Sequence, residues 1–146
     1  EVIVEQVQPL ADAKEITLMT DLELELWVQG DPDHLTSLFL NLLDNAVKYT
    51  PKGGVVRLCS SIQTREIQIV VSNTGSEISP DHLPHLFERF YRVESARSFG
   101  AWRSQSQAGA GLGLAIAQEM IRLHGGTIEA SSKLGTTAFT VKLPLV

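Results

Sequence analysis

Apolar residues recur at helical spacing in several parts of the chain. These patterns predict three long helices, at about Val4–Ala13, Pro32–Tyr49 and Gly111–His124. Asp31 before Pro32 is typical of a helix start, because a capping residue is followed by proline at the first helical position. Pro51 stops this second helix, and Gly125 with Gly126 closes the third.

Runs that are rich in apolar residues, or that alternate them with polar ones, predict strands. These runs are Ile16–Met19, Leu24–Val28, Val55–Ile62, Glu66–Ser72, Thr127–Ser131 and Thr137–Leu143. We expect hairpin loops at Gln63–Arg65 and around Gly135, a loop at Asn73–Ser79 and a short helix at Pro80–Phe90. The order of elements indicates an α+β domain, with one mixed or antiparallel sheet and helices on one face.

The stretch from Glu94 to Ala110 differs from the rest of the chain. Ser, Arg, Gln, Gly and Ala dominate it, and no apolar periodicity is present. A connection of this length is either disordered or a functional lid. Its basic residues, Arg97 and Arg103, would suit a segment that folds over a polyanion.

Composition narrows the class of protein. The chain has 146 residues, 43% of them hydrophobic, which fits one globular domain with a real core. A single cysteine cannot form an internal disulfide bond, which excludes a small protein held together by disulfides. No apolar run approaches the roughly 18 residues that a membrane span needs. The net charge of −5 argues against non-specific nucleic-acid binding.

Polar residues form a stripe along the second predicted helix. Ser37, Asn41, Asn45 and Lys48 follow one another at spacings of four, four and three, which places them on one face. Asparagine is a poor helix former, so two asparagines one turn apart suggest that their side chains have a functional role. An amide oxygen suits Mg²⁺ and lysine can meet a phosphate oxygen. The alternative is an ordinary solvated face.

Three short segments carry glycine next to predicted strands or helices: Asn73–Gly75, Gly109–Gly113 and Gly135–Thr137. The second opens a helix, where bare backbone N–H groups and the helix dipole favour an anion. It fits neither the dinucleotide fingerprint, which needs a preceding strand, nor Walker A, because no Lys-Ser or Lys-Thr follows. A simple tight turn is the alternative.

Taken together and in order, these segments resemble the catalytic, ATP-binding domain of bacterial sensor histidine kinases, within the gyrase/Hsp90/histidine-kinase/MutL superfamily. The matching segments are Asn41–Thr50 (N box), Asn73–Ile78 (first glycine box), Leu86–Arg92 (F box), Gly109–Leu114 (second glycine box), His124–Gly126 and Gly135–Thr137. The resemblance covers essentially the whole chain. It implies a single domain over residues 1–146 with the Bergerat α/β two-layer sandwich, in which a mixed sheet of about five strands is backed by three helices and carries a long ATP lid.

The resemblance also implies roles for the matched residues in binding ATP with Mg²⁺. Asn45 would coordinate the metal, Asn41 would lie beside the phosphates, and Lys48 would reach a phosphate. The lid, Glu94–Ala108, would supply Arg97. The other implied nucleotide-binding residues are Tyr49, Asn73, Gly75, Ile78, Phe90, Arg92, Gly109, Gly111, Leu112, Gly113, Leu114 and Thr137. The N–H groups of Leu112, Gly113 and Leu114 would surround the phosphates, and Thr137 would lie near adenine.

Two positions depart from the family pattern in the first glycine box. Asn73 stands where the family has the aspartate that accepts a hydrogen bond from the adenine amino group, and Glu77 stands at a glycine position. Because a neutral acceptor binds less strongly than a charged one, we expect roughly tenfold weaker ATP binding. A degenerate nucleotide-sensing or interaction module is therefore an alternative. A serine kinase of the anti-sigma type is another, which Lys48, Tyr49 and the F box disfavour.

The function implied is transfer of the ATP γ-phosphoryl group to a histidine on a separate upstream domain, in two-component signal transduction. Superfamily ATPases place a glutamate base where this chain has Asn41, and an amide cannot take a proton from water. None of the four histidines lies in a recognisable phosphoacceptor motif. We therefore expect this chain to be a monomeric piece of a homodimeric kinase. Its expected partners are the upstream dimerisation domain and a response regulator receiver domain, with no nucleic acid. We expect it to lie in the cytoplasm, whether or not the parent is membrane-anchored.

Overall fold

The computed structural model describes residues 2–22, 30–75, 77–88 and 113–144. Along these residues the elements are α1 (Val2–Ala13), β1 (Thr17–Asp21), α2 (Pro32–Tyr49), β2 (Val55–Gln63), β3 (Glu66–Thr74), the 3₁₀ turn η1 (Leu83–His85), α4 (Gly113–Leu123), β4 (Thr127–Lys133) and β5 (Thr136–Pro144). No helix in this part of the chain is long and apolar enough to cross a membrane.

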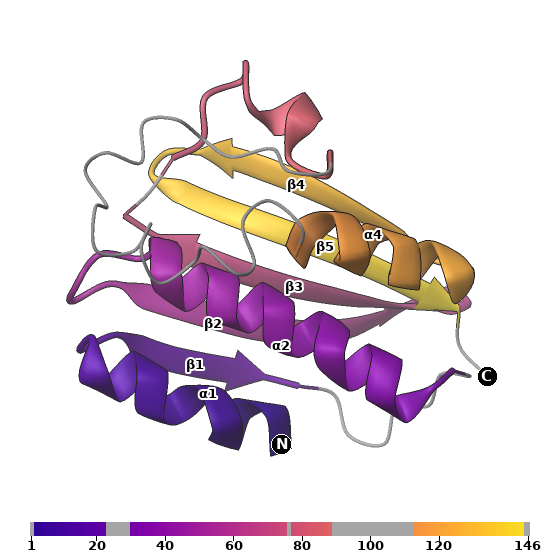
Figure 1. The fold of residues 1–146 in the computed structure, drawn as a ribbon, viewed down its shortest axis with the longest axis horizontal. Coiled ribbons are helices and arrows are strands. Elements are labelled where there is room, and N and C mark those ends of the chain that lie inside the picture. Colours follow the sequence, from indigo (N-terminus) through magenta and orange to yellow (C-terminus); the bar gives the residue numbers. More distant parts are fainter. Residues whose placement is uncertain (1, 23–29, 76, 89–112, 145–146) are drawn as a thin grey trace.

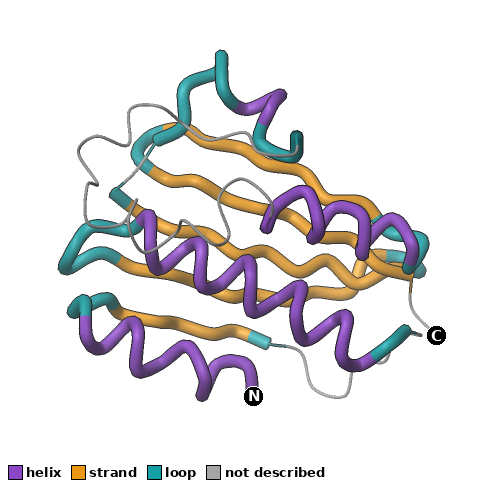
Figure 2. Tube along the Cα trace, in the orientation of Figure 1, coloured by secondary structure: helices purple, strands orange, loops and turns teal. Residues whose placement is uncertain are grey.

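The strands form one mixed sheet of five strands in the order β1-β2-β3-β5-β4. β1 pairs with β2 in parallel, and every other neighbouring pair is antiparallel. Helices α1, α2 and α4 all lie on one face of this sheet (Figures 1 and 2). The architecture confirms the predicted two-layer sandwich.

The core lies between the sheet and its helices. Leu38, Leu42 and Leu43 from α2 are almost completely buried against sheet residues such as Val56 and Val71. Burying one such side chain contributes about 1.5–3 kcal/mol, so α2 is held in place mainly by this apolar face. The other face of α2 is left to carry polar residues.

Local signals set the ends of α2. The Asp31 carboxylate accepts hydrogen bonds from the backbone N–H groups of Asp33 (2.8 Å) and His34 (3.3 Å), as expected for a helix cap. The same bonds, with His34 as the larger cause, hold the pKa of Asp31 below its ordinary value. At the other end, the Thr50 hydroxyl donates to the Ala46 carbonyl at 2.6 Å.

The imidazole of His124 links the start of α2 to the end of α4. Its Nε2 lies 3.1 Å from the Asp31 N–H and accepts that hydrogen bond. Nδ1 lies 2.6 Å from the Met120 carbonyl and must then donate.

Three expectations about element boundaries were wrong. β3 continues through Thr74, so Asn73 lies in the sheet and not in a loop. Gln63 pairs with Glu66, which shortens the first hairpin loop to Thr64 and Arg65. Of the helix predicted at Pro80–Phe90, only the 3₁₀ turn η1 forms within the described residues, because Pro84 cannot donate a backbone hydrogen bond. The predicted strand Leu24–Val28 and the segment Glu94–Ala110 lie outside the described residues.

Candidate functional site

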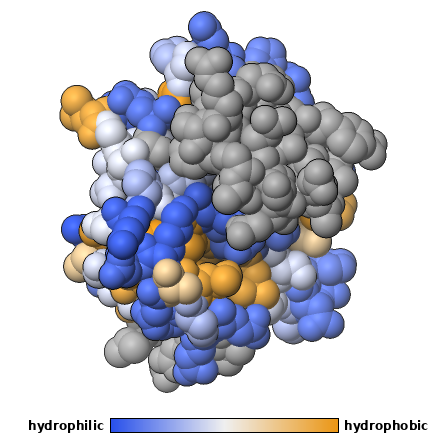
Figure 3. Space-filling model, turned by 60° about the vertical axis from the view of Figure 1, so that its left-hand side comes forward, coloured by the Kyte–Doolittle hydropathy of each residue, from blue (hydrophilic) through white to orange (hydrophobic). Residues whose placement is uncertain are grey.

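Most of the described candidate residues gather at one end of the sandwich. The C-terminal end of α2, the end of β3 and the tip of the β4–β5 hairpin lie at the left of Figure 1, and the first turn of α4 faces the same end. Figure 3 brings this side of the molecule forward and shows hydrophilic side chains around a smaller apolar area. The fold thus brings together segments that are far apart in the sequence.

The polar stripe on α2 forms as the spacing predicts. Ser37 is exposed, whereas Asn41, Asn45 and Lys48 are half-buried beside the apolar face of the helix. The Lys48 Nζ lies 3.0 Å from a carboxylate oxygen of Asp44, one turn earlier on the same helix. Both side chains are half-buried, so the pair adds modest stability and places the Lys48 ammonium beside Asp44.

Asn73 and Thr137 form the buried polar part of the site. They are directly opposite each other in the antiparallel β3–β5 register, and their relative exposures are only 4% and 2%. The Thr137 hydroxyl also lies 2.9 Å from the hydroxyl of Ser132 on β4. An amide and a hydroxyl side by side on the helix-covered face of a sheet form a polar patch inside an otherwise apolar layer.

Two hydrogen bonds fix the loop after β3 to the β4–β5 hairpin. The Gly75 N–H donates to the Gly135 carbonyl at 2.8 Å, and the Ile78 N–H donates to the Ser132 hydroxyl at 2.6 Å. Gly75 has φ +82°, and a Cβ there would press on the ring of Pro51. The positive φ and the close approach of Pro51 together explain why residue 75 is glycine.

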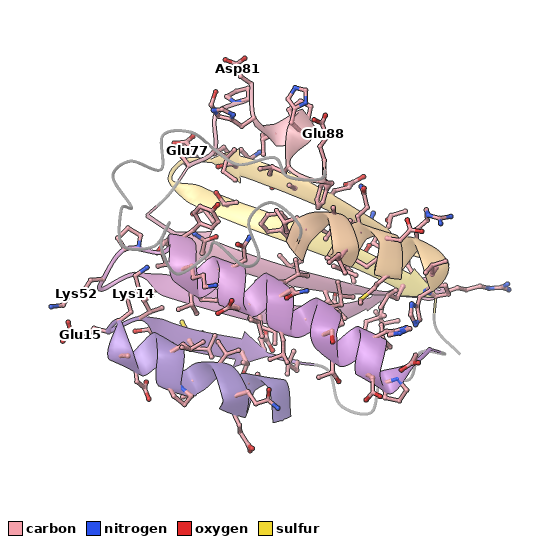
Figure 4. All side chains as sticks on the ribbon, viewed as in Figure 1. Lys14, Glu15, Lys52, Glu77, Asp81 and Glu88 are labelled. Atoms are coloured by element: carbon pink, nitrogen blue, oxygen red, sulfur yellow. The ribbon has the colours of Figure 1, made fainter. Side chains whose placement is uncertain are left out.

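Glu77 is exposed, and in Figure 4 its side chain lies near the tip of the β4–β5 hairpin. Of the two positions that depart from the expected glycine-box pattern, Asn73 is buried in the sheet and Glu77 is exposed.

At the start of α4, the structure describes Gly113 and Leu114, whose N–H groups belong to the first helical turn. Such N–H groups have no partner within the helix and suit an anion. Among the described residues, nothing lies within 4 Å of a Cβ built on Gly113, so space is open there. The candidate residues Phe90, Arg92, Arg97, Gly109, Gly111 and Leu112 lie outside the described residues.

The donor set within the described residues fits a weakly held, hard cation. No group of three or more His, Cys, Asp or Glu side chains that could hold a metal by themselves occurs in this part of the chain. A metal at Asn45 would rely on its amide oxygen and on ligands from elsewhere. Mg²⁺ is commonly bound in this way, through few protein oxygens together with substrate phosphates.

Two residues that make contacts at this end of the molecule were not predicted from the sequence. Ser132 holds both the Ile78 N–H and the Thr137 hydroxyl, and Lys14 contacts the end of α2. A serine in an alternating strand and a lysine after a helix give no local signal, because their partners come from distant parts of the chain.

Comparison of this chain with known proteins identifies its family. The model of the family described as "Histidine kinase-, DNA gyrase B-, and HSP90-like ATPase" matches residues 30–146. The chain belongs to this family. Sensor protein VanS of Enterococcus faecium is 42% identical over 120 residues, which are 82% of this chain and 29% of VanS. Sensor histidine kinase RppB of Synechocystis sp. is 39% identical over 145 residues, 98% of this chain and 31% of RppB.

The structure of the mycobacterial sensor histidine kinase MprB aligns with a TM-score of 0.81 at 30% identity, over 99% of this chain and 93% of that one. The domain is thus of the ATP-binding catalytic type found in sensor histidine kinases. It spans about a quarter to a third of the length of the curated relatives that it matches.

Proposed function

We propose that this domain binds ATP with Mg²⁺ and supplies its γ-phosphoryl group to a histidine on an upstream domain of the same parent protein. The observation that carries the proposal is the buried Asn73–Thr137 pair at the same end of the sandwich as the Asn41–Asn45–Lys48 stripe. The pair offers a hydrogen-bonding patch for a base, and the stripe offers an amide ligand and an ammonium for the phosphates.

Each described residue has a defined task in this proposal. Asn73 accepts a hydrogen bond from the adenine amino group, with Thr137 beside it. Lys48 neutralises phosphate charge, and the first N–H groups of α4 bind the phosphate tail. Asn45 would hold Mg²⁺, which would neutralise negative charge on the phosphates. Lid residues, Arg97 among them, complete the phosphate contacts.

In the transfer step, an imidazole nitrogen forms a bond to the γ-phosphorus as the bond from that phosphorus to the ADP oxygen breaks. The imidazole N–H proton leaves to solvent, and ADP carries the leaving negative charge. Asn41 cannot act as a general base toward water, so hydrolysis is not assisted at this position. We therefore propose transfer to histidine in preference to hydrolysis.

The partners follow from the same proposal. They are the dimerisation and phosphoacceptor domain of a homodimeric parent, and then the receiver domain of a response regulator. The domain acts in the cytoplasm, where ATP is available.

The experiment supplies the domain and its parent's phosphoacceptor domain with γ-labelled ATP and Mg²⁺. We expect label that is labile in acid and stable in base, as for phosphohistidine. Lys48→Met and Asn45→Ala should each remove most of the label, whereas Gln118→Ala, on an exposed position of α4, should leave it unchanged. Label that persists in Lys48→Met, or that is stable in acid, would overturn the proposal.

A nucleotide-sensing module without transfer is the second candidate, and Asn73 is the observation that favours it. An amide in place of a carboxylate weakens the hold on the adenine amino group. Measurable ATP binding by calorimetry, together with no transfer to the phosphoacceptor domain, would support this candidate instead.

A further inference from the structure

Lys14, the residue that follows α1, reaches across to the end of α2. Its Nζ donates hydrogen bonds to the backbone carbonyls of Lys48 at 2.7 Å and Val47 at 3.1 Å. The side chain is half-buried, and burial lowers the pKa of its ammonium. Partial burial of a lysine ammonium costs free energy unless its N–H groups donate hydrogen bonds.

The carbonyls that Lys14 binds are those that a helix leaves without a partner. The last four C=O groups of a helix have no N–H of the same helix to accept from, and they carry the negative end of the helix dipole. Thr50 supplies its N–H and hydroxyl to the Ala46 carbonyl. Lys14 serves the carbonyl of Lys48, and it shares that of Val47 with the Thr50 N–H.

The turn around Lys14 is joined to the loop after α2 at further points. The Gly53 N–H donates to the Glu15 carbonyl at 3.1 Å, and the Thr17 N–H donates to the Gly54 carbonyl at 3.0 Å. Glu15 and Lys52 form an ion pair at 2.7 Å, and Figure 4 shows these charged side chains together at this end of the molecule. The Lys52 side chain is 76% exposed and the Glu15 side chain 62%, so this ion pair adds little stability.

The same turn of α2 carries two residues of the candidate site, Lys48 and Tyr49. The backbone of Lys48 is held by Lys14 through its carbonyl, and its side chain is held by Asp44 one turn earlier. If the ammonium of Lys14 is removed, the carbonyl of Lys48 loses this hydrogen bond and the last turn can fray. The Lys48 ammonium would then occupy a wider range of positions.

We propose that Lys14 is a positioning residue for the nucleotide: it fixes the last turn of α2 so that Lys48 meets the phosphates. This inference rests on the proposed function, because it assumes that Lys48 contacts ATP. Lys14 itself touches no substrate in this proposal. Its effect is transmitted through the backbone of one helical turn.

The test replaces Lys14 by Met, which keeps the aliphatic stem and removes the donors. We expect the Kd for Mg·ATP, measured by calorimetry, to rise roughly threefold to tenfold. Adenosine, which has no phosphate, should lose less affinity than ATP. A purely structural role would reduce the folded fraction and would lower binding of both ligands equally.

Two further variants complete the design. Lys52→Met removes a lysine from the adjoining loop, whose partner is the exposed Glu15 carboxylate, and should change the Kd for ATP by less than about twofold. Lys14→Arg retains donors for the carbonyls and should restore part of the affinity. If Lys14→Met does not fold, Lys14→Gln, which keeps one N–H donor group, takes its place.

The outcomes separate the two proposals. A wild-type domain that fails to bind Mg·ATP overturns the proposed function and with it the role of Lys14. Wild-type binding that is unchanged in Lys14→Met, or an equal loss for ATP and adenosine, overturns the positioning role alone.

Discussion

Asn73 on β3 and Thr137 on β5 lie directly opposite each other in the sheet, and both side chains are almost completely buried on the helix-covered face. A buried amide beside a buried hydroxyl is costly in an apolar layer unless both are hydrogen-bonded. In the proposed function, this pair is the place where the adenine base is recognised. We therefore expect a substitution of Asn73 to change nucleotide binding more than a substitution of the exposed Glu77.

Asn73→Asp should bind Mg·ATP roughly tenfold more tightly, because a charged acceptor strengthens a hydrogen bond to the adenine amino group by about 1–1.5 kcal/mol. The free domain should lose stability at the same time, since the new carboxylate is buried. Glu77→Gly alone should change the affinity less, because Glu77 is exposed. Calorimetry on the two single variants and the double variant checks this. An unchanged Kd in the double variant would show that neither position limits binding.

Gly75→Ala should destabilise the domain more than Gly53→Ala. Both glycines have positive φ, +82° and +86°, so both substitutions strain the backbone. Only Gly75 meets a neighbour, the ring of Pro51, whereas nothing lies within 4 Å of a Cβ on Gly53. We expect an additional loss of about 1 kcal/mol for Gly75→Ala in urea unfolding. Equal losses for the two variants would mean that Pro51 moves aside without cost.

Gly30 and His124 should be energetically coupled. A Cβ on Gly30 would overlap the His124 ring, which accepts the Asp31 N–H and so joins α2 to α4. Gly30→Ala should therefore cost more stability in the wild type than in a His124→Ala background, with a coupling of about 1 kcal/mol. Urea unfolding of the wild type, both single variants and the double variant measures this term. Additive effects would contradict a direct contact.

Asp31 should contribute to the loss of stability in acid. Its pKa is lowered in the folded state, first by the N–H of His34 and then by that of Asp33. A depressed folded-state pKa stabilises the domain above the unfolded-state value of about 3.9, and this contribution is lost as the pH falls through the folded-state value. Asp31→Asn should accordingly flatten the dependence of the urea midpoint on pH below about pH 4. The same acid slope in both proteins would argue against this role.

Much of the fold follows from short-range signals. Asp31 and Pro32 set the start of α2, and the glycine after α4 ends that helix, as Gly125 with φ +77° shows. Its N–H donates to the Arg122 carbonyl and the Gly126 N–H to that of Ile121, which closes the helix. These bonds span only a few residues, so the local sequence is enough to predict them. The apolar face of α2 and the alternation in the strands similarly predict the two-layer sandwich.

The sequence alone also determined the family of this chain, because boxes that are weak singly occur together in the right order. The tertiary structure decided which of their residues meet. The length of β3 placed Asn73 in the sheet opposite Thr137, and the packing of α1 brought Lys14 to the carbonyls of Val47 and Lys48. Such contacts join residues far apart in the chain. They depend on strand register and helix packing, which local periodicity does not specify.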